Sequence, residues 1–135
     1  MAPSCSLSEV HTPFTFSNAG DALLAGGQRF EVTPDAGSKR ALLQWYAVAL
    51  SFPAYFGYNF DALEECLCDL SWLPAGRIVL YHSRLPLLES DQANERELYL
   101  RVLAAAVRHW QRARGRELLV AFHPDCAPSL QALML

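Results

Sequence analysis

The sequence predicts an α/β fold built on a small parallel sheet. Residues 77–81 and 118–122 are continuous apolar runs of strand length, as is typical of strands buried on both faces of a parallel sheet. One long amphipathic helix separates the two runs, so together they predict a βαβ unit with a right-handed crossover. The 135 residues are the usual size of one domain.

The amino-terminal part predicts one strand and one helix. We expect residues 1–28 to be an extension, and residues 29–32, which alternate polar and apolar, to form a short strand before the turn-forming residues 33–37. Ser38 is a suitable N-cap for a helix whose apolar positions recur at helical spacing. Pro53 ends that helix because it moves Phe52 out of the α region.

The long helix carries its charges where the helix dipole favours them. Glu95 and Glu97 stand in its first turns, and its last turns before Gly115 are basic, with Arg108, His109, Arg112 and Arg114. Dipole compensation explains these bases, and a net charge of −3 does not suit a general nucleic-acid binder. We therefore expect no direct binding of nucleic acid.

The remaining composition favours a cytoplasmic protein with free thiols. The apolar runs are far shorter than the ~20 residues needed to span a bilayer, and the amino terminus lacks the pattern of a secretory signal. Cys66 and Cys68 lie two apart in a helical pattern, and no second cysteine pair completes a structural zinc site. Residues 123–135 are expected to be a tail that packs back onto the domain, with a dimer contact as the alternative.

Residues 54–70, AYFGYNFDALEECLCDL, predict a loop followed by an amphipathic helix. Asn59 or Asp61 can cap this helix, and Asp61 and Glu64 have the spacing of a capping box. The core-facing arc holds Leu63, Cys66, Leu67 and Leu70. The opposite arc is acidic, with Asp61, Glu64, Glu65 and Asp69, and Cys68 projects among these carboxylates.

These carboxylates have no local counterion. No lysine or arginine lies between Arg40 and Arg77, so the like-charge i,i+4 pairs Asp61/Glu65 and Glu65/Asp69 each cost about 0.2–0.5 kcal/mol. Four aromatic residues lead into the helix, and Gly57 is expected at a positive φ that turns the loop tightly. Aromatic rings beside unneutralised carboxylates suit a cationic partner, so we assign Tyr55 and Tyr58 to it.

The residues alone leave three other interpretations of the acidic arc. It could be an ordinary solvated face. Its side chains could bind a metal, although no histidine is near and ligands on one straight helix would surround an ion poorly. A carboxylate pair could also serve hydrolysis, as in glycosidases, yet nothing in the sequence supplies the walls of a cleft. We predict no metal, no cofactor and no catalytic residue.

Residues 52–67, FPAYFGYNFDALEECL, resemble the signature of the barstar family of intracellular ribonuclease inhibitors. The spacing of Pro, Tyr, Gly, Asn, Asp-Ala-Leu, acid and Cys-Leu matches without a gap, and the element order agrees over residues 29–122. The resemblance implies a barstar-like domain over that range, with a three-stranded parallel sheet packed with about four helices. It also implies an inhibitor that blocks a barnase-type ribonuclease with its acidic helix and the preceding loop.

Site residues can be carried over from the resemblance by position. Tyr55 and Gly57 are similar to the loop tyrosine and glycine of the family, and Asp61 to its first inhibitory carboxylate. Glu65 stands where a central aspartate fills the phosphate-binding site, and a further family acid corresponds to Glu95 or Glu97. The full partner-binding set that we expect is Tyr55, Gly57, Tyr58, Asp61, Glu64, Glu65, Cys68 and Asp69.

Two departures from the family pattern alter the shape of this surface. Glu65 replaces an aspartate, and Glu64 stands where the family has an aromatic contact. The implied function is that of a cytoplasmic inhibitor, not an enzyme, whose partner is a basic ribonuclease of extracellular type in a toxin–antitoxin or immunity setting. The alternative is a barstar-like interaction domain whose basic partner is not a ribonuclease.

Overall fold

A four-stranded parallel sheet forms the centre of the computed structural model, which describes residues 13–32, 38–86, 88 and 93–134. Its strands are β1 (Thr15–Phe16), β2 (Gln28–Val32), β3 (Arg77–His82) and β4 (Glu117–Phe122), in the order β1-β4-β3-β2. Every neighbouring pair is parallel. The predicted α/β class with a parallel sheet and a βαβ crossover is therefore confirmed.

The predicted number of strands is wrong, because the described sheet has four strands and not three. The additional strand, β1, comes from the segment that the sequence predicts to be an extension. It pairs with the end of β4, with Thr15 opposite Ala121 and Phe16 opposite Phe122. A strand of two residues is too short to show an alternating pattern, so periodicity cannot reveal it.

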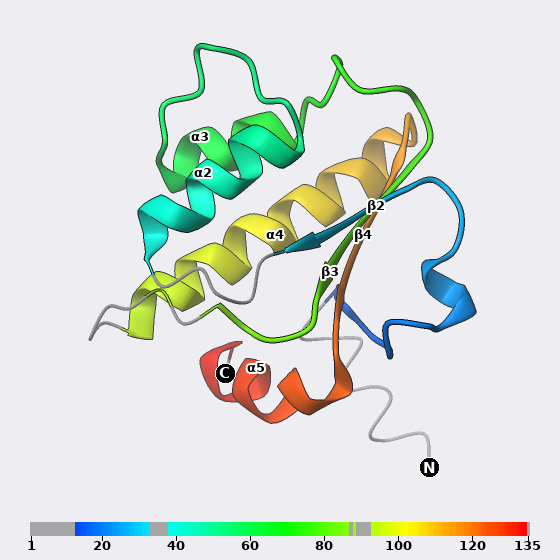
Figure 1. Cartoon of the computed structure of the whole chain (residues 1–135), viewed down its shortest axis with the longest axis vertical. Coiled ribbons are helices and arrows are strands. Elements are labelled where there is room, and N and C mark those ends of the chain that lie inside the picture. The colour runs from blue at the N-terminus through cyan, green and yellow to red at the C-terminus, as the bar shows by residue number, and fades with distance from the viewer. Residues whose placement is uncertain (1–12, 33–37, 87, 89–92, 135) are drawn as a thin grey trace.

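The described helices are α2 (Lys39–Ala49), α3 (Phe60–Leu67), α4 (Ala93–Ala113) and α5 (Ala127–Met134), with 3-10 turns η1 (Ala22–Leu24) and η2 (Pro124–Cys126). Figure 1 shows α2, α3 and α4 gathered on one face of the sheet, with α5 near the carboxyl end of β4. Leu130 of α5 is buried in the core, so the expected packing of the tail against the domain is confirmed. None of the helices described here is long and apolar enough to cross a membrane.

The main core lies between the sheet and the three helices on that face. The helices supply fully buried residues such as Leu42, Leu63 and Leu103, and β3 and β4 supply Ile78 and Phe122. α2 begins at the predicted N-cap, because the Ser38 hydroxyl accepts a hydrogen bond from the Ala41 amide at 3.1 Å. This packing fixes the frame on which α3 and its preceding loop are held.

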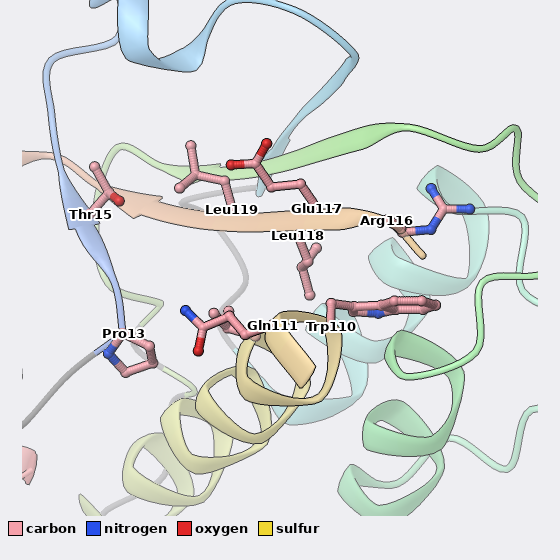
Figure 2. Close-up of a pocket in the computed structure, with 9 residues that line it drawn as sticks. Pro13, Thr15, Trp110, Gln111, Arg116, Glu117, Leu118 and Leu119 are labelled. Atoms are coloured by element: carbon pink, nitrogen blue, oxygen red, sulfur yellow. The ribbon is translucent and has the colours of Figure 1, made fainter. Parts of the chain in front are cut away.

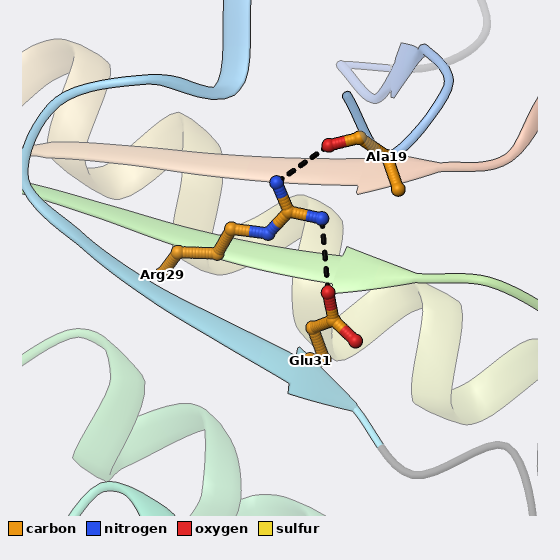
Figure 3. A network of polar contacts seen from close by, with 3 residues as sticks. All are labelled: Ala19, Arg29 and Glu31. Carbon is orange, nitrogen blue, oxygen red and sulfur yellow. Dashed lines mark hydrogen bonds and ion pairs between the residues drawn. The ribbon is translucent and has the colours of Figure 1, made fainter. Parts of the chain in front are cut away.

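The other face of the sheet is covered in part by the amino-terminal segment. Leu24 of η1 packs there with Val79, Tyr81 and Ala121. Arg29 of β2 donates hydrogen bonds to the Ala19 carbonyl at 2.6 Å and to the Glu31 carboxylate at 3.0 Å, as Figure 3 shows. Its guanidinium also lies 4.9 Å from the centre of the Tyr81 ring. The arginine therefore joins this segment to the sheet.

A glycine is required where this segment enters β2. Gly27 has a φ of 77°, and a Cβ at this position would lie 2.2 Å from the Arg77 carbonyl oxygen. A side chain here would meet both an unfavourable backbone conformation and a backbone atom that cannot move away.

Candidate functional site

The acidic helix α3 begins at Asn59. The Asn59 side-chain oxygen accepts a hydrogen bond from the Ala62 amide at 2.7 Å, and its backbone is extended, as at an N-cap. Of the two caps that the sequence leaves open, the structure selects Asn59. Asp61 then lies in the first turn, where its charge is favourable, and the capping box predicted from Asp61 and Glu64 does not form.

The two faces of α3 are divided largely as the sequence predicts. The four residues of the core-facing arc, Leu63, Cys66, Leu67 and Leu70, are all buried. Asp61, Glu65 and Asp69 are exposed, whereas Glu64 and Cys68 are half-buried. Among the described residues, no base forms an ion pair with any of these four carboxylates. Their charges are therefore available to a partner.

Asp69 does not belong to the helix. α3 ends at Leu67 with Cys68 as its C-cap, so Asp69 lies on the turn that follows and not on a continuing acidic arc. The amides of Asp69 and Leu70 both donate to the Cys66 carbonyl, each at 3.1 Å, and Leu70 has a left-handed φ of 50°. Glu65 and Asp69 are therefore not an i,i+4 pair within one helix, as the sequence predicts. Glu65 lies in α3, and Asp69 lies in the turn after it.

Stacked aromatic rings hold the loop before α3. Phe52 stacks on the buried Tyr46 with 6.3 Å between ring centres, and Phe56 meets Phe52 edge-on at 4.8 Å. The Tyr58 ring lies 4.8 Å from that of Phe56. Phe56 is buried, whereas Tyr55 is 71% exposed and Tyr58 47% exposed. The loop thus has an anchored inner side and presents two tyrosines to solvent.

The left-handed residue of this loop is Tyr58 and not Gly57. Tyr58 has a φ of 54°, while Gly57 is absent from the residues with positive φ, so the predicted conformation of Gly57 is wrong. A left-handed conformation costs a residue with a side chain about 1–2 kcal/mol. The contact between the Tyr58 and Phe56 rings offsets part of that cost. The presence of a glycine in the loop gave no indication of this contact.

The expected site residues form two groups. Partial desolvation of the Tyr55 hydroxyl, although its side chain is largely exposed, and then the charges of Asp69, Cys66 and Glu65 raise its pKa, so Glu65 and Asp69 both lie within electrostatic range of Tyr55. Burial and Glu64 raise the pKa of the Cys68 thiol, against a lowering by Arg112 of α4. Glu64 and Cys68 therefore lie toward α4, on the other side of α3.

Glu95 and Glu97, either of which could correspond to the further family acid, differ in their contacts. Glu97 accepts a hydrogen bond from Arg101 at 2.6 Å, one turn further along α4. Glu95 lies in the first turn of α4 and has no such pair among the described residues. Glu97 is therefore already partnered, and Glu95 is the more available of the two.

Sequence reasoning missed the residues that support the end of α3. The Trp110 indole of α4 donates to the Leu67 carbonyl at 2.8 Å, and Arg116 donates to the Leu70 carbonyl at 3.1 Å and the Leu73 carbonyl at 3.2 Å. Both residues lie more than 40 positions further along the chain. No local pattern could have linked them to α3.

The structure also contains a cavity of about 290 Å³ that Trp110 and Arg116 help to line. Figure 2 shows it between Thr15 of β1, Gln111 of α4 and Glu117 of β4. None of the expected partner-binding residues lines it. Within the described residues, no three His, Cys, Asp or Glu side chains meet in a group that could bind a metal ion. Cys66, Cys68 and Cys126 are free thiols.

The sequence matches a protein-family model over most of its length. The family model described as Barstar (barnase inhibitor) matches residues 32–123, which is more than half of the chain. The match includes the loop, α3 and the βαβ unit. The chain has no significant match among curated proteins.

Proposed function

The chain belongs to the barstar family, and from this premise we propose that it inhibits a barnase-type ribonuclease by covering the active site with α3 and its preceding loop. The observation that carries the proposal is the group formed by Tyr55, Glu65 and Asp69. It is exposed, and its carboxylates have no ion-pair partner among the described residues. Such a group binds a cationic surface without first breaking an internal ion pair.

The chemistry of ribonucleases suits this arrangement. An enzyme that binds RNA positions lysine and arginine side chains for phosphate groups, and carboxylates on a rigid support can occupy the same positions. Asp61 and Glu65 project from α3, and Asp69 adds a third carboxylate from the following turn. The exposed ring of Tyr55 supplies contact area beside these charges.

Inhibition of this kind needs neither bond making nor a cofactor, because occupancy of the phosphate positions excludes RNA. An inhibitor of this kind in the cytoplasm would protect a cell that makes or receives the ribonuclease. Cys68 acts at most as a contact, since its raised pKa keeps the thiol protonated at neutral pH.

A second candidate is an interaction domain for a basic protein that is not a ribonuclease. Glu64 and Glu65 favour it, because they replace the aromatic and aspartate of the family pattern and alter both shape and reach. The acidity is kept, so the partner remains cationic. The two candidates differ in whether the captured partner cleaves RNA.

The test is protection of RNA from a barnase-type ribonuclease by the chain at equimolar concentration. We expect wild-type protein to block cleavage and Glu65→Ala to lose most of the inhibition while keeping its fold by circular dichroism. Asp125→Ala is the matched control, because Asp125 is an exposed acid of η2, directly before α5, and Figure 1 shows α5 at the opposite end of the molecule from α3. Full inhibition by Glu65→Ala would refute the proposed surface. No inhibition by wild type would favour the second candidate.

A further inference from the structure

The carboxyl end of α3 is held by side chains from the other half of the chain. The last carbonyls of a helix have no partner within it, and a short helix needs one from elsewhere. For α3 the partner of Leu67 is the Trp110 indole of α4, whose Nε1 donates at 2.8 Å. This bond fixes the point at which the chain leaves the helix.

Arg116 holds the turn that follows. Its Nη2 donates to the carbonyls of Leu70 and Leu73, and its Nη1 lies 3.4 Å from the Gly76 carbonyl. Its guanidinium also lies 5.7 Å from the centre of the Trp110 ring. Figure 2 shows the Trp110 and Arg116 side chains extending to the same side from α4 and the start of β4. We call this pair the clamp.

Asp69 lies between the two attachment points. The Leu67 carbonyl precedes it and the Leu70 carbonyl follows it, and both accept from the clamp. Leu70 is buried with a left-handed φ of 50°, a conformation that is unfavourable unless the surroundings support it. The backbone of Asp69 is thus fixed on both sides while its carboxylate stays exposed.

The clamp also leaves the acidic surface charged. Arg116 is bound by neutral carbonyls, and none of its hydrogen bonds goes to Glu65 or Asp69. A lysine could not replace it, because a single ammonium lacks the planar fork that reaches several carbonyls at once.

We propose that Trp110 and Arg116 are positioning residues for the partner-binding surface, because their hydrogen bonds to Leu67, Leu70 and Leu73 hold Asp69 beside Glu65 and Tyr55. The inference rests on the proposed function. Neither residue needs to touch the partner, since both act through the backbone on either side of Asp69.

The test is a double-mutant cycle on inhibition of a barnase-type ribonuclease. Arg116→Lys is expected to weaken inhibition by about tenfold in the wild-type background and by less than about twofold in the Asp69→Ala background, as for coupled neighbours. Trp110→Phe, which keeps an aromatic ring but removes the indole N–H, should follow the same pattern. Arg114→Lys is the matched control, because Arg114 is exposed and donates no side-chain hydrogen bond to α3 or its turn. Equal losses with and without Asp69 would overturn the proposal.

A second measurement separates the clamp from the ribonuclease function. Hydrogen exchange of the isolated chain should become faster at the amides of Leu70 and Leu73 in Arg116→Lys, because these amides bond within the clamped turn. Exchange in α2 should not change. If the wild-type chain inhibits no ribonuclease, the proposed function fails. The exchange rates then still test whether Arg116 holds the turn. Unchanged rates at Leu70 and Leu73 would refute this role.

Discussion

The hydroxyl oxygen of Tyr99 lies 2.7 Å from Nε2 of His82, and both side chains are fully buried. The other ring nitrogen of His82, Nδ1, lies 3.2 Å from the Ala121 carbonyl, which can only accept. Nδ1 therefore carries the hydrogen, and Nε2 accepts from Tyr99. The Tyr46 hydroxyl, 2.6 Å from that of Tyr99, must then donate to it. The three side chains therefore join α2, α4 and β3 by a chain of hydrogen bonds in which Tyr46 donates to Tyr99, Tyr99 to His82, and His82 to the Ala121 carbonyl.

This network makes the stability of the protein depend on pH. Burial lowers the pKa of His82 to about 3, while an unfolded histidine titrates near its usual 6.5. Between these values the unfolded chain binds a proton that the folded chain does not, so stability falls as the pH drops below about 6.5. We expect His82 to lower the free energy of unfolding by about 2 kcal/mol between pH 7 and pH 5.

Urea denaturation at the two pH values measures this loss. His82→Gln should be less stable at pH 7 but should lose about 2 kcal/mol less than wild type on going to pH 5. His109→Gln is the control, because His109 is only half-buried on α4. An identical pH dependence in wild type and His82→Gln would show that His82 titrates normally in the fold.

The central position of Tyr99 in this network predicts unequal effects of two similar substitutions. Tyr46→Phe removes one donor and leaves Tyr99 still donating to His82, so it should cost about 1 kcal/mol. Tyr99→Phe leaves the Tyr46 hydroxyl and His82 Nε2 both without their partner in the core, so it should cost about 2–4 kcal/mol. Urea denaturation at pH 7 compares them. Equal costs would contradict the central position of Tyr99 in the network.

Gly27 and Gly57 should respond differently to substitution by alanine. Gly27→Ala places a Cβ 2.2 Å from the Arg77 carbonyl oxygen at a φ of 77°, so we expect a loss of about 2–3 kcal/mol. Gly57→Ala meets the Asn59 amide nitrogen at 3.4 Å and the Ala62 Cβ at 3.8 Å, which are ordinary contacts. It should change stability by less than about 0.5 kcal/mol. Thermal unfolding of both variants tests this, and a large loss in Gly57→Ala would restore a conformational role for that glycine.

The sequence predicted those parts of the fold whose signals are local. The continuous apolar runs revealed β3 and β4, Ser38 marked the start of α2, and the helical spacing placed Leu63 and Leu67 in the core. β1 was missed because two residues carry no periodicity, and its pairing with Ala121 and Phe122 depends on chain more than 100 positions away.

The candidate site was predictable in its residue types but not in its geometry. The spacing from Tyr55 to Glu65 indicated the loop and the helix, whereas the end of α3 at Leu67 depends on Trp110 and Arg116. The left-handed residue is a tyrosine where glycine was expected, and the contact of its ring with Phe56 offsets part of the backbone cost. Long-range contacts, which no short pattern contains, support the end of α3.

Glu64 and Glu65 adjoin in the sequence but should differ in their effect on inhibition. Glu65 is exposed and within electrostatic range of Tyr55, whereas Glu64 is half-buried and faces Cys68 near Arg112. We expect Glu65→Gln to weaken inhibition of a barnase-type ribonuclease at least about tenfold, as for one well-placed charge pair, and Glu64→Gln less than about threefold. Inhibition constants at 50 and 300 mM salt measure both, and the Glu65→Gln loss should shrink at high salt because the interaction is exposed and screened. A larger loss from Glu64→Gln would move the centre of the surface to the side of α3 that faces α4.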